Sequence, residues 1–347
     1  MSLTLPRHAW PEADRTMWDD LRKDAGPLDY PGGLAHVRQT TITSLEVRYE
    51  RWMMWLTTSD PAALHLPPVA RATLPRLQSW LEALAHTRPM TRLAYIDGVL
   101  RILRAADPDQ DWTMQLRLQK GLKRNAGRGD PARKRGRILS SAVLLKAGQT
   151  HADVDPFTVP TALKRMIRQR DGMMIALLAL LPIRRRSFCE LTLGQSVHVT
   201  DEEIIISLSD DMTKTGVSWE AAVPAQVEAG LRSYIADVRP ALLARGGAHH
   251  DILWVGKRGE IMGQDYIGSR IGDVTLKLTG KRVSPHLFRD AAATTLARIS
   301  PESARLIGPV LAHSGSRTAE RYYIHAQTID AGRDYAALVQ RLKKGRP

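Results

Sequence analysis

A basic, glycine-rich segment near the middle of the chain constrains the fold more than any other feature. Residues 120–139 read KGLKRNAGRGDPARKRGRIL, with Asp130 as the only acid. Glycine, proline and clustered like charges disfavour a packed helix or strand. Because 347 residues exceed one typical domain, we place a basic linker at 125–137. A separate domain is expected on each side of it.

The part before the linker predicts a compact helical domain. Apolar residues recur at helical spacing in about four segments between Thr40 and Leu122, and prolines interrupt them. Residues 1–35 look irregular, with a short helix around 14–23 and a break at the Pro-Gly-Gly of 31–33. We expect an N-terminal arm or leader at 1–35 and a helical core DNA-binding domain at 36–124.

The part after the linker predicts a domain of helices with a small antiparallel sheet. Residues 160–181 read as a helix whose second half is apolar, as in a buried core helix. The β-branched run 204–206 and the stretch ending at Pro224 read as two strands, with TKTG in the loop between them. This domain is placed at 138–330, and an amphipathic C-terminal helix at 331–347. The predicted fold class is mainly α, with two domains.

The charge of the chain indicates an acidic polymer as partner, most simply double-stranded DNA. The formal net charge is +14, and the basic residues cluster on the first domain and the linker. A solvated helix surface and a plain linker are the alternatives. The candidates for contact with the DNA backbone are Arg92, Arg101, Arg117, Lys120, Lys123, Arg124, Arg128, Arg133, Lys134, Arg135 and Arg137.

Other classes of protein are disfavoured by what the sequence lacks. It has one cysteine, Cys189, so an intrachain disulfide is excluded, and it has no CxxC pattern. His249 and His250 have no candidate metal ligands nearby, so no metal is expected. The longest apolar run, 173–181, is too short to span a bilayer. We expect a cytoplasmic, DNA-associated protein with no membrane partner.

The last quarter of the chain holds a candidate anion site. Ser284 and Pro285 are typical of a helix start, and His286 and Arg289 then lie three residues apart on one face. Such a pair near a helix N-terminus suits a phosphate. His313 and the pair Tyr322-Tyr323 follow, and a phenol is the only plausible nucleophile among these groups. Each residue taken alone is more often structural.

Two more candidates lie earlier in the second domain. Arg184, Arg185 and Arg186 directly follow the apolar helix. One of them is expected at the edge of the core, where a fixed guanidinium binds an anion bidentately. Lys214 is expected at the tip of the TKTG hairpin.

In this order the residues resemble the tyrosine recombinase, or phage-type integrase, family across about 138–330. PIRRRSFCEL is similar to the family's GLR-x-x-E-L box, TKTG to its strand-turn lysine, HLFRD to its HxxR, LAH to its LGH, and TAERYYIHA to its nucleophile segment. The resemblance implies the catalytic residues Arg184, Lys214, His286, Arg289, His313 and Tyr323. The helical domain would be the family's core-binding domain.

Departures from the family pattern leave two assignments open. Pro182 stands for the usual glycine and Ser187 for a common acid, so Arg185 or Arg186 could take the role of Arg184. Ala312 replaces a glycine. Tyr322 follows His313 by nine residues and Tyr323 by ten. We favour Tyr323, because the local string resembles a subgroup whose nucleophile is the second position.

The resemblance implies a site-specific recombinase, as in mobile-element integration, that cleaves and rejoins DNA through a 3′-phosphotyrosine without ATP, metal or cofactor. Arg184 and Arg289 would hold the non-bridging oxygens, and Lys214 would protonate the leaving 5′ oxygen. His313 would add a hydrogen bond, and His286 would assist proton removal or hold the phosphate. Homo-oligomers are implied: two protomers on a core site and a tetramer in synapsis, with the terminal helix packing in trans. The alternatives are a topoisomerase-like nicking-closing protein and a DNA-binding regulator.

Overall fold

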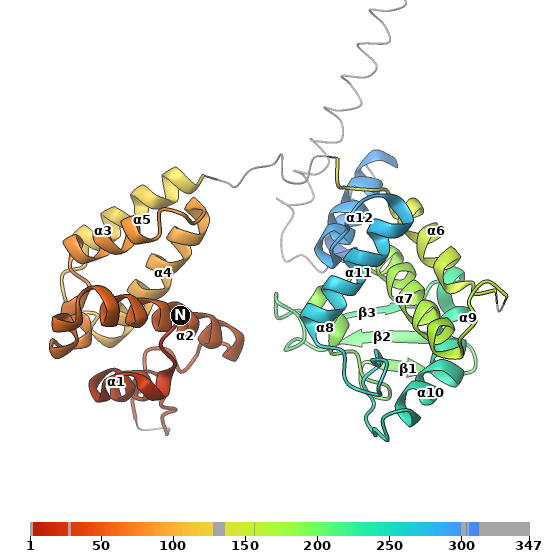
Figure 1. The fold of residues 1–347 in the computed structure, drawn as a ribbon, viewed down its shortest axis with the longest axis horizontal. Helices are drawn as coiled ribbons and strands as arrows, with labels where there is room; N and C mark the ends of the chain where they lie inside the picture. The colour runs from red at the N-terminus through yellow and green to blue at the C-terminus, as the bar shows by residue number, and fades with distance from the viewer. Residues whose placement is uncertain are drawn as a thin grey trace, which may run out of the picture. The chain divides into compact units, whose positions relative to one another are not determined.

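The chain divides into two compact units, Met1–Pro131 and Ala132–Pro347. The computed structural model describes residues 3–26, 29–127, 136–155, 157–299, 303 and 305–311. Unit 1 runs from red to yellow in Figure 1, and unit 2 from yellow-green to blue. Each unit has a hydrophobic core of its own. The boundary between the units falls inside the segment predicted as a linker.

Unit 1 is helical throughout its described residues. Helices α2 and α4 pack together, and α4 also packs against α5. Tryptophans fill the core: the ring centroids of Trp52 and Trp80 lie 4.9 Å apart, and both side chains are buried. The elements are η1 Arg7–Ala9, α1 Glu12–Arg22, α2 Gln39–Ser59, η2 Pro61–His65, η3 Pro68–Arg71, α3 Leu74–Ala83, α4 Pro89–Ala106 and α5 Thr113–Ala126.

The N-terminal segment is part of unit 1, whereas the sequence suggested a separate arm or leader. Trp10 and Trp18 are 2% and 0% exposed, and their rings meet edge to face at 5.8 Å. The Trp10 indole nitrogen donates to the carbonyl of Leu5 at 2.8 Å. Two buried indoles contribute a large apolar area, so this segment belongs to the core of the helical unit.

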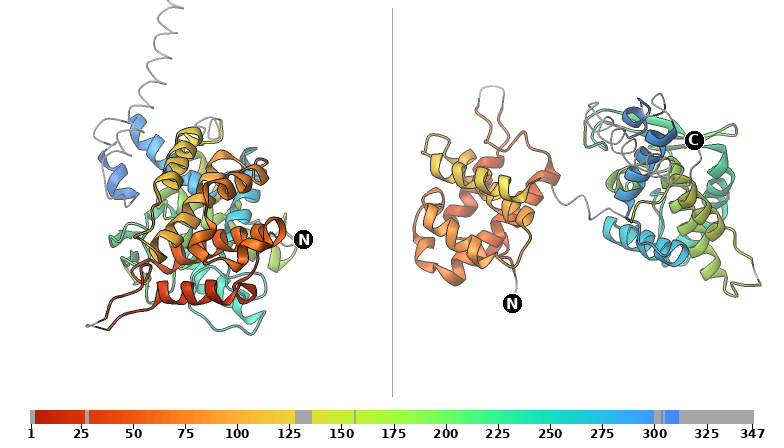
Figure 2. Two further views of the ribbon diagram at one scale, coloured as in Figure 1. Left: turned by 90° about the vertical axis from the view of Figure 1, so that its left-hand side faces the viewer. Right: turned by 90° about the horizontal axis from the view of Figure 1, so that it is seen from above.

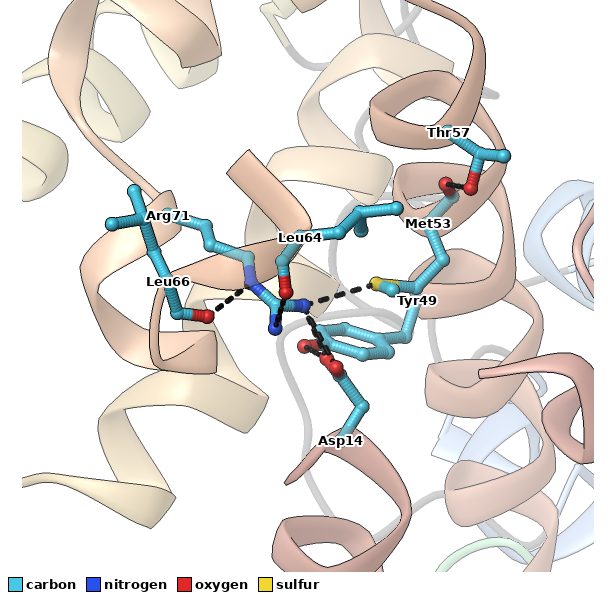
Figure 3. Close-up of polar contacts among 7 residues, drawn as sticks. All are labelled: Asp14, Tyr49, Met53, Thr57, Leu64, Leu66 and Arg71. Carbon is cyan, nitrogen blue, oxygen red and sulfur yellow. Dashed lines mark hydrogen bonds and ion pairs between the residues drawn. The ribbon is translucent and has the colours of Figure 1, made fainter. Parts of the chain in front are cut away.

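A buried ion pair fixes α1 against the rest of unit 1 (Figure 3). Nη1 of Arg71 lies 2.8 and 2.7 Å from the two carboxylate oxygens of Asp14, and the Tyr49 hydroxyl donates to the same carboxylate at 2.7 Å. Arg71 also donates to the carbonyls of Leu66 and Leu64. All three charged or polar side chains are 0% exposed. Burial and the Asp14 charge hold the pKa of Tyr49 well above its ordinary value.

Unit 2 has helices around a small sheet, so the predicted fold class is confirmed. Ser140 and Thr161 cap α6 and α7 by accepting from backbone N–H groups of the first turn. The elements are α6 Ser141–Ala152, α7 Ala162–Leu180, α8 Arg185–Cys189, β1 Val197–Val199, β2 Ile204–Leu208, β3 Trp219–Ala222, α9 Ala225–Ser233, the π-helical turn η5 Tyr234–Val238, α10 Arg239–Ala244, α11 Gln264–Thr279, α12 Pro285–Ile299 and α14 Ile307–Val310.

Helix α7 is the centre of unit 2, and α6, α9, α11 and α12 pack on it (Figures 1 and 2). Its contact with α6 depends on two glycines. A Cβ on Gly148 would lie 2.5 Å from the backbone nitrogen of Ala176, and one on Gly172 would lie 2.4 Å from that of Ala152. The backbones therefore approach more closely than any larger residue would allow.

The described residues of unit 2 contain a three-stranded antiparallel sheet of order β1-β2-β3. Ile206 pairs with Val197 on one side and with Ala221 on the other. The β2–β3 connection carries the TKTG sequence, as the pattern predicted. Pro240 occupies the first turn of α10, directly after the π-helical turn, where a missing N–H costs little. None of the helices in the described ranges combines the length and apolar character needed to cross a membrane.

The buried ion pair of unit 1 predicts an unequal response to two substitutions in α1. Asp14→Ala strands the Arg71 guanidinium in the core and is expected to lower the free energy of unfolding by about 3–5 kcal/mol. Asp19→Ala removes only the exposed pair with Arg7 and is expected to cost at most about 1 kcal/mol. Urea unfolding followed by tryptophan fluorescence measures both. Equal losses for the two variants would contradict the assignment.

Candidate active site

A small cavity in unit 2 collects residues from α8, the β2–β3 hairpin, α12 and α14. It has a volume of about 20 Å³, enough for roughly one water molecule. Its lining residues are Pro182, Ile183, Arg184, Ser187, Leu208, Thr213, Trp219, Arg289, Val310 and Leu311. Two of the predicted site residues, Arg184 and Arg289, therefore share one cavity.

Arg184 is the member of the arginine triplet that lines this cavity. Arg185 instead lies 3.4 Å from the carboxylate of Asp265, and Arg186 pairs with Glu190 at 3.0 Å. Burial lowers the pKa of Arg184 from its ordinary value, yet a guanidinium stays charged at neutral pH. A partly desolvated guanidinium at the edge of a cavity is well suited to bind an anion.

Arg289 is buried and joins two distant parts of the backbone. Its Nη1 donates to the carbonyl oxygen of Pro182 at 2.7 Å, and its Nη2 donates to that of Leu311. The side chain is 7% exposed. These bonds connect α12 to the residue pair that precedes Arg184 and to the end of α14.

His286 lies in the first turn of α12, three residues before Arg289, as the sequence predicted. Its side chain is exposed and does not line the cavity. Because residues at i and i+3 share a helix face, the imidazole lies on the side of α12 that carries Arg289. His286 and Arg289 therefore share one side of α12, where His286 is exposed and Arg289 is buried.

The Lys214 turn is tied to the same cavity through its neighbours. Thr213 is 3% exposed and lines the cavity, whereas Lys214 itself is exposed. The Ser187 hydroxyl donates to the carbonyl of Met212 at 2.7 Å. Trp219 on β3 donates from its indole nitrogen to the carbonyl of Pro309 at 3.1 Å. The hairpin is therefore fastened to both α8 and α14.

Ser187 and Trp219 also line the cavity, although the sequence did not indicate them as candidates. The signal for Ser187 was present, since it stands where an acid is common in the family that the chain resembles. Trp219 carried no comparable signal. The predicted residues His313 and Tyr323, the alternative Tyr322, and the linker residues Arg128, Arg133, Lys134 and Arg135 lie outside the described residues.

The basic side chains predicted for DNA contact are mostly exposed. Arg101 on α4, four residues of α5 and Arg137 all face solvent, while Arg92 is half-buried; the α5 residues are Arg117, Lys120, Lys123 and Arg124. Exposure is what a contact to a phosphate backbone requires.

Unit 1 also has a wide groove between the N-terminal halves of α2 and α4, which sequence reasoning did not predict. Hydroxyl, methyl-bearing and basic side chains line it: Thr40, Thr43, Ser44, Val47, Arg48, Met90, Thr91, Ala94 and Tyr95. The Arg51 guanidinium lies over the Tyr95 ring at 5.3 Å. Such a mixture can both donate hydrogen bonds and contact apolar groups.

The described residues include no group of three or more His, Cys, Asp or Glu side chains that could hold a metal ion. Residues 1–2, 27–28, 128–135, 156, 300–302, 304 and 312–347 lie outside this search, so the expectation of no metal stays a prediction.

Comparison with known proteins adds a family and a fold. Residues 157–328 match the model of the family described as "Phage integrase family". No curated protein matches the chain. A XerH site-specific recombinase bound to its difH substrate in a pre-cleavage complex is 13% identical, with a TM-score of 0.56, covering 95% of this chain and 97% of that one. Its post-cleavage complex with palindromic difH is 12% identical, with a TM-score of 0.57, covering 92% and 95%. At these identities the two structures show a shared fold.

The single cysteine in α8 predicts an unreactive thiol. Cys189 is 5% exposed, and burial raises the pKa of its thiol to about 12. Since the thiolate is the reactive form, only on the order of one molecule in 10⁴ is ionised at pH 8. Iodoacetamide at pH 8 is expected to leave the native protein unlabelled and to label it fully in urea, as measured by intact mass. Rapid alkylation of the native protein would contradict this burial.

Proposed function

The chain belongs to the phage integrase family through residues 157–328, and we propose that it is a tyrosine-type, site-specific DNA recombinase. The observation that carries the proposal is the pair Arg184 and Arg289 in one cavity, beside the turn that presents Lys214. The two XerH structures with this fold are of a site-specific recombinase bound to its substrate before and after cleavage. That description supports the same activity here.

Two arginines at one cavity would meet a requirement of the attack of a phenol on a phosphodiester. The pentavalent state gains negative charge on its non-bridging oxygens, and fixed cations stabilise this charge without reorganising. Arg184 and Arg289 are proposed to hold these oxygens, with His313 donating a further hydrogen bond. The buried, doubly hydrogen-bonded Arg289 is a rigid donor of this kind.

The proposed cleavage step balances without an external reactant. The phenol oxygen of Tyr323 forms a bond to phosphorus, and the bond from phosphorus to the 5′ oxygen breaks. His286 takes or relays the phenolic proton, and Lys214 gives a proton to the departing 5′ oxygen. The products are a 3′-phosphotyrosine and a free 5′ hydroxyl. Attack by a 5′ hydroxyl of a second duplex reverses the step and joins the strands, so we propose that neither ATP nor a metal takes part.

DNA contact is proposed for the exposed basic residues of α4, α5 and the linker. Phosphate contacts position a protein on DNA, whereas base edges supply sequence preference. The groove between α2 and α4 offers hydroxyl and methyl groups for such edges. Because the chain belongs to this family, two protomers are proposed to occupy a core site and four protomers to form the synapse. The protein is proposed to act in the cytoplasm, in association with DNA.

Two alternatives use the same scaffold. A nicking-closing protein would form the same covalent intermediate but would rejoin the original strands. A DNA-binding regulator would form no adduct, and it would gain nothing from two arginines in one cavity beside a lysine turn. Strand exchange between two duplexes distinguishes the first alternative, and adduct formation distinguishes the second.

The choice of nucleophile predicts a selective loss of the covalent adduct. On a nicked duplex that the protein has selected from a random pool, wild type is expected to accumulate a protein–DNA adduct resolvable by denaturing electrophoresis. Tyr323→Phe is expected to abolish this adduct, because it lacks the attacking oxygen, and Tyr322→Phe to retain it. The reverse pattern would transfer the role to Tyr322. Absence of an adduct from wild type would favour the regulator.

Binding through phosphates predicts a steep salt dependence. Each neutralised phosphate contributes about −0.9 to the slope of log K against log salt. Lys120→Ala combined with Lys123→Ala on α5 is expected to reduce the steepness by about 2 and to weaken binding to all sequences. Lys23→Ala, an exposed lysine of the same unit, is the control and is expected to leave the slope unchanged. Titrations by fluorescence anisotropy at several salt concentrations measure it, and unchanged slopes for the α5 variant would remove this helix from the interface.

A further inference from the structure

We propose that Ser187 and Thr213 are positioning residues that fix the Lys214 turn beside Arg184 and Arg289, so that Lys214 protonates the leaving 5′ oxygen. This inference rests on the proposed function and deepens it. In this proposal, the hydroxyl groups of Ser187 and Thr213 determine the geometry of proton transfer from Lys214.

Ser187 connects the backbone that carries Arg184 to the hairpin that carries Lys214. It lies on α8 three residues after Arg184, the N-cap residue of this helix, and both residues line the cavity. The serine is 3% exposed, and its hydroxyl donates to the carbonyl of Met212 at 2.7 Å. Met212 is two residues before Lys214, so the bond anchors the entry to the turn.

Thr213 closes the turn on the other side of Lys214. Its side chain is 3% exposed, and its Oγ1 accepts from the backbone N–H of Val217 at 3.1 Å. The hydroxyl proton on the same oxygen has two acceptors within reach, the carbonyl oxygens of Val217 at 2.9 Å and of Asp210 at 3.1 Å. Gly216 takes the left-handed conformation within this turn, with φ of +68°. The backbone is therefore held two residues before Lys214, at Met212, and three residues after it, at Val217.

A fixed backbone matters for Lys214, because its side chain is exposed and is not packed in the cavity. A lysine ammonium sits on a flexible stem with four rotatable bonds, so the position of its Cα decides where the ammonium can reach. Arg184 gains its position directly from α8. Loss of either hydroxyl would leave the anion-binding arginines in place but would displace the proton donor. A displacement of about 1 Å can cost about 10²-fold in rate.

The contact at Ser187 requires a hydroxyl. A carbonyl oxygen only accepts hydrogen bonds, so its partner must have a proton to donate. An ionised carboxylate at position 187 would repel the Met212 carbonyl instead. The serine therefore suits this particular connection between α8 and the turn.

The test compares two leaving groups on the same nicked duplex, selected by the protein from a random pool. One substrate has the natural 5′ oxygen at the scissile phosphate. The other has a bridging sulfur, which departs as a thiolate without a proton. Ser187→Ala and Thr213→Val remove the two hydroxyl groups. The conservative substitutions Ser187→Thr and Thr213→Ser keep a hydroxyl group at each position. Ser196→Ala is the matched control, since Ser196 is also 3% exposed and accepts from the backbone N–H of Thr192 at 2.8 Å, outside the cavity.

Ser187→Ala and Thr213→Val are expected to slow adduct formation on the oxygen substrate by about 10–100-fold. On the sulfur substrate both are expected to remain close to wild type, and their DNA affinity is expected to be unchanged. The variants that keep a hydroxyl group should retain cleavage of the oxygen substrate. Ser196→Ala should match wild type on both substrates.

Three outcomes would overturn the inference. An equal loss on both substrates would show that the hydroxyls support the fold or the phosphate site rather than the proton donor. No loss on the oxygen substrate would show that they do not position Lys214. In both cases wild type still forms an adduct, so the proposed function stands. If wild type forms no adduct on either substrate, the proposed function fails and the inference fails with it.

Discussion

The guanidinium of Arg289 holds the cavity of unit 2 together. It donates to the carbonyls of Pro182 and Leu311, which lie before α8 and after α14. Because the side chain is 7% exposed, loss of the donor would leave both carbonyls buried and unsatisfied. A single side chain of α12 therefore fixes Pro182, two residues before Arg184, relative to Leu311, two residues before His313 in the sequence. The indole of Trp219 adds a second link to α14 through Pro309.

The local pattern of apolar residues predicted most helices and strands of the fold. It did not predict features that depend on contacts between residues far apart in the sequence. Helical periodicity indicated α2, α4, α5 and α7, and β-branched residues with the intervening TKTG indicated the β2–β3 hairpin. The packing of residues 3–26 was not predictable in this way, because periodicity shows that Trp18 and Leu21 share a helix face but not which distant side chains cover that face. The partner of Asp14 is Arg71, far along the chain in a short 3₁₀ turn that carries no signal of its own.

The candidate site shows the same division between local and distant information. The spacing of His286 and Arg289 follows from the helix alone, so the sequence predicted their shared face. Helix spacing alone does not show which of three consecutive arginines lines the cavity. In the structure Arg185 pairs with Asp265 of α11 and Arg186 pairs with Glu190, so Arg184 remains. The connection from Ser187 to Met212 crosses from a helix to a hairpin, and only a folded chain brings those atoms together.

The position of Asp14 gives the leading helix a chemical role inside unit 1. Among the contacts of the described residues, Asp14 is the carboxylate paired with Arg71 (Figure 3). A fragment trimmed to begin at α2 would keep every basic side chain of α4 and α5, yet it would leave the Arg71 guanidinium without its carboxylate. Helix α1 thus supplies the counter-ion of Arg71, and an N-terminal deletion that removes this helix would destabilise unit 1.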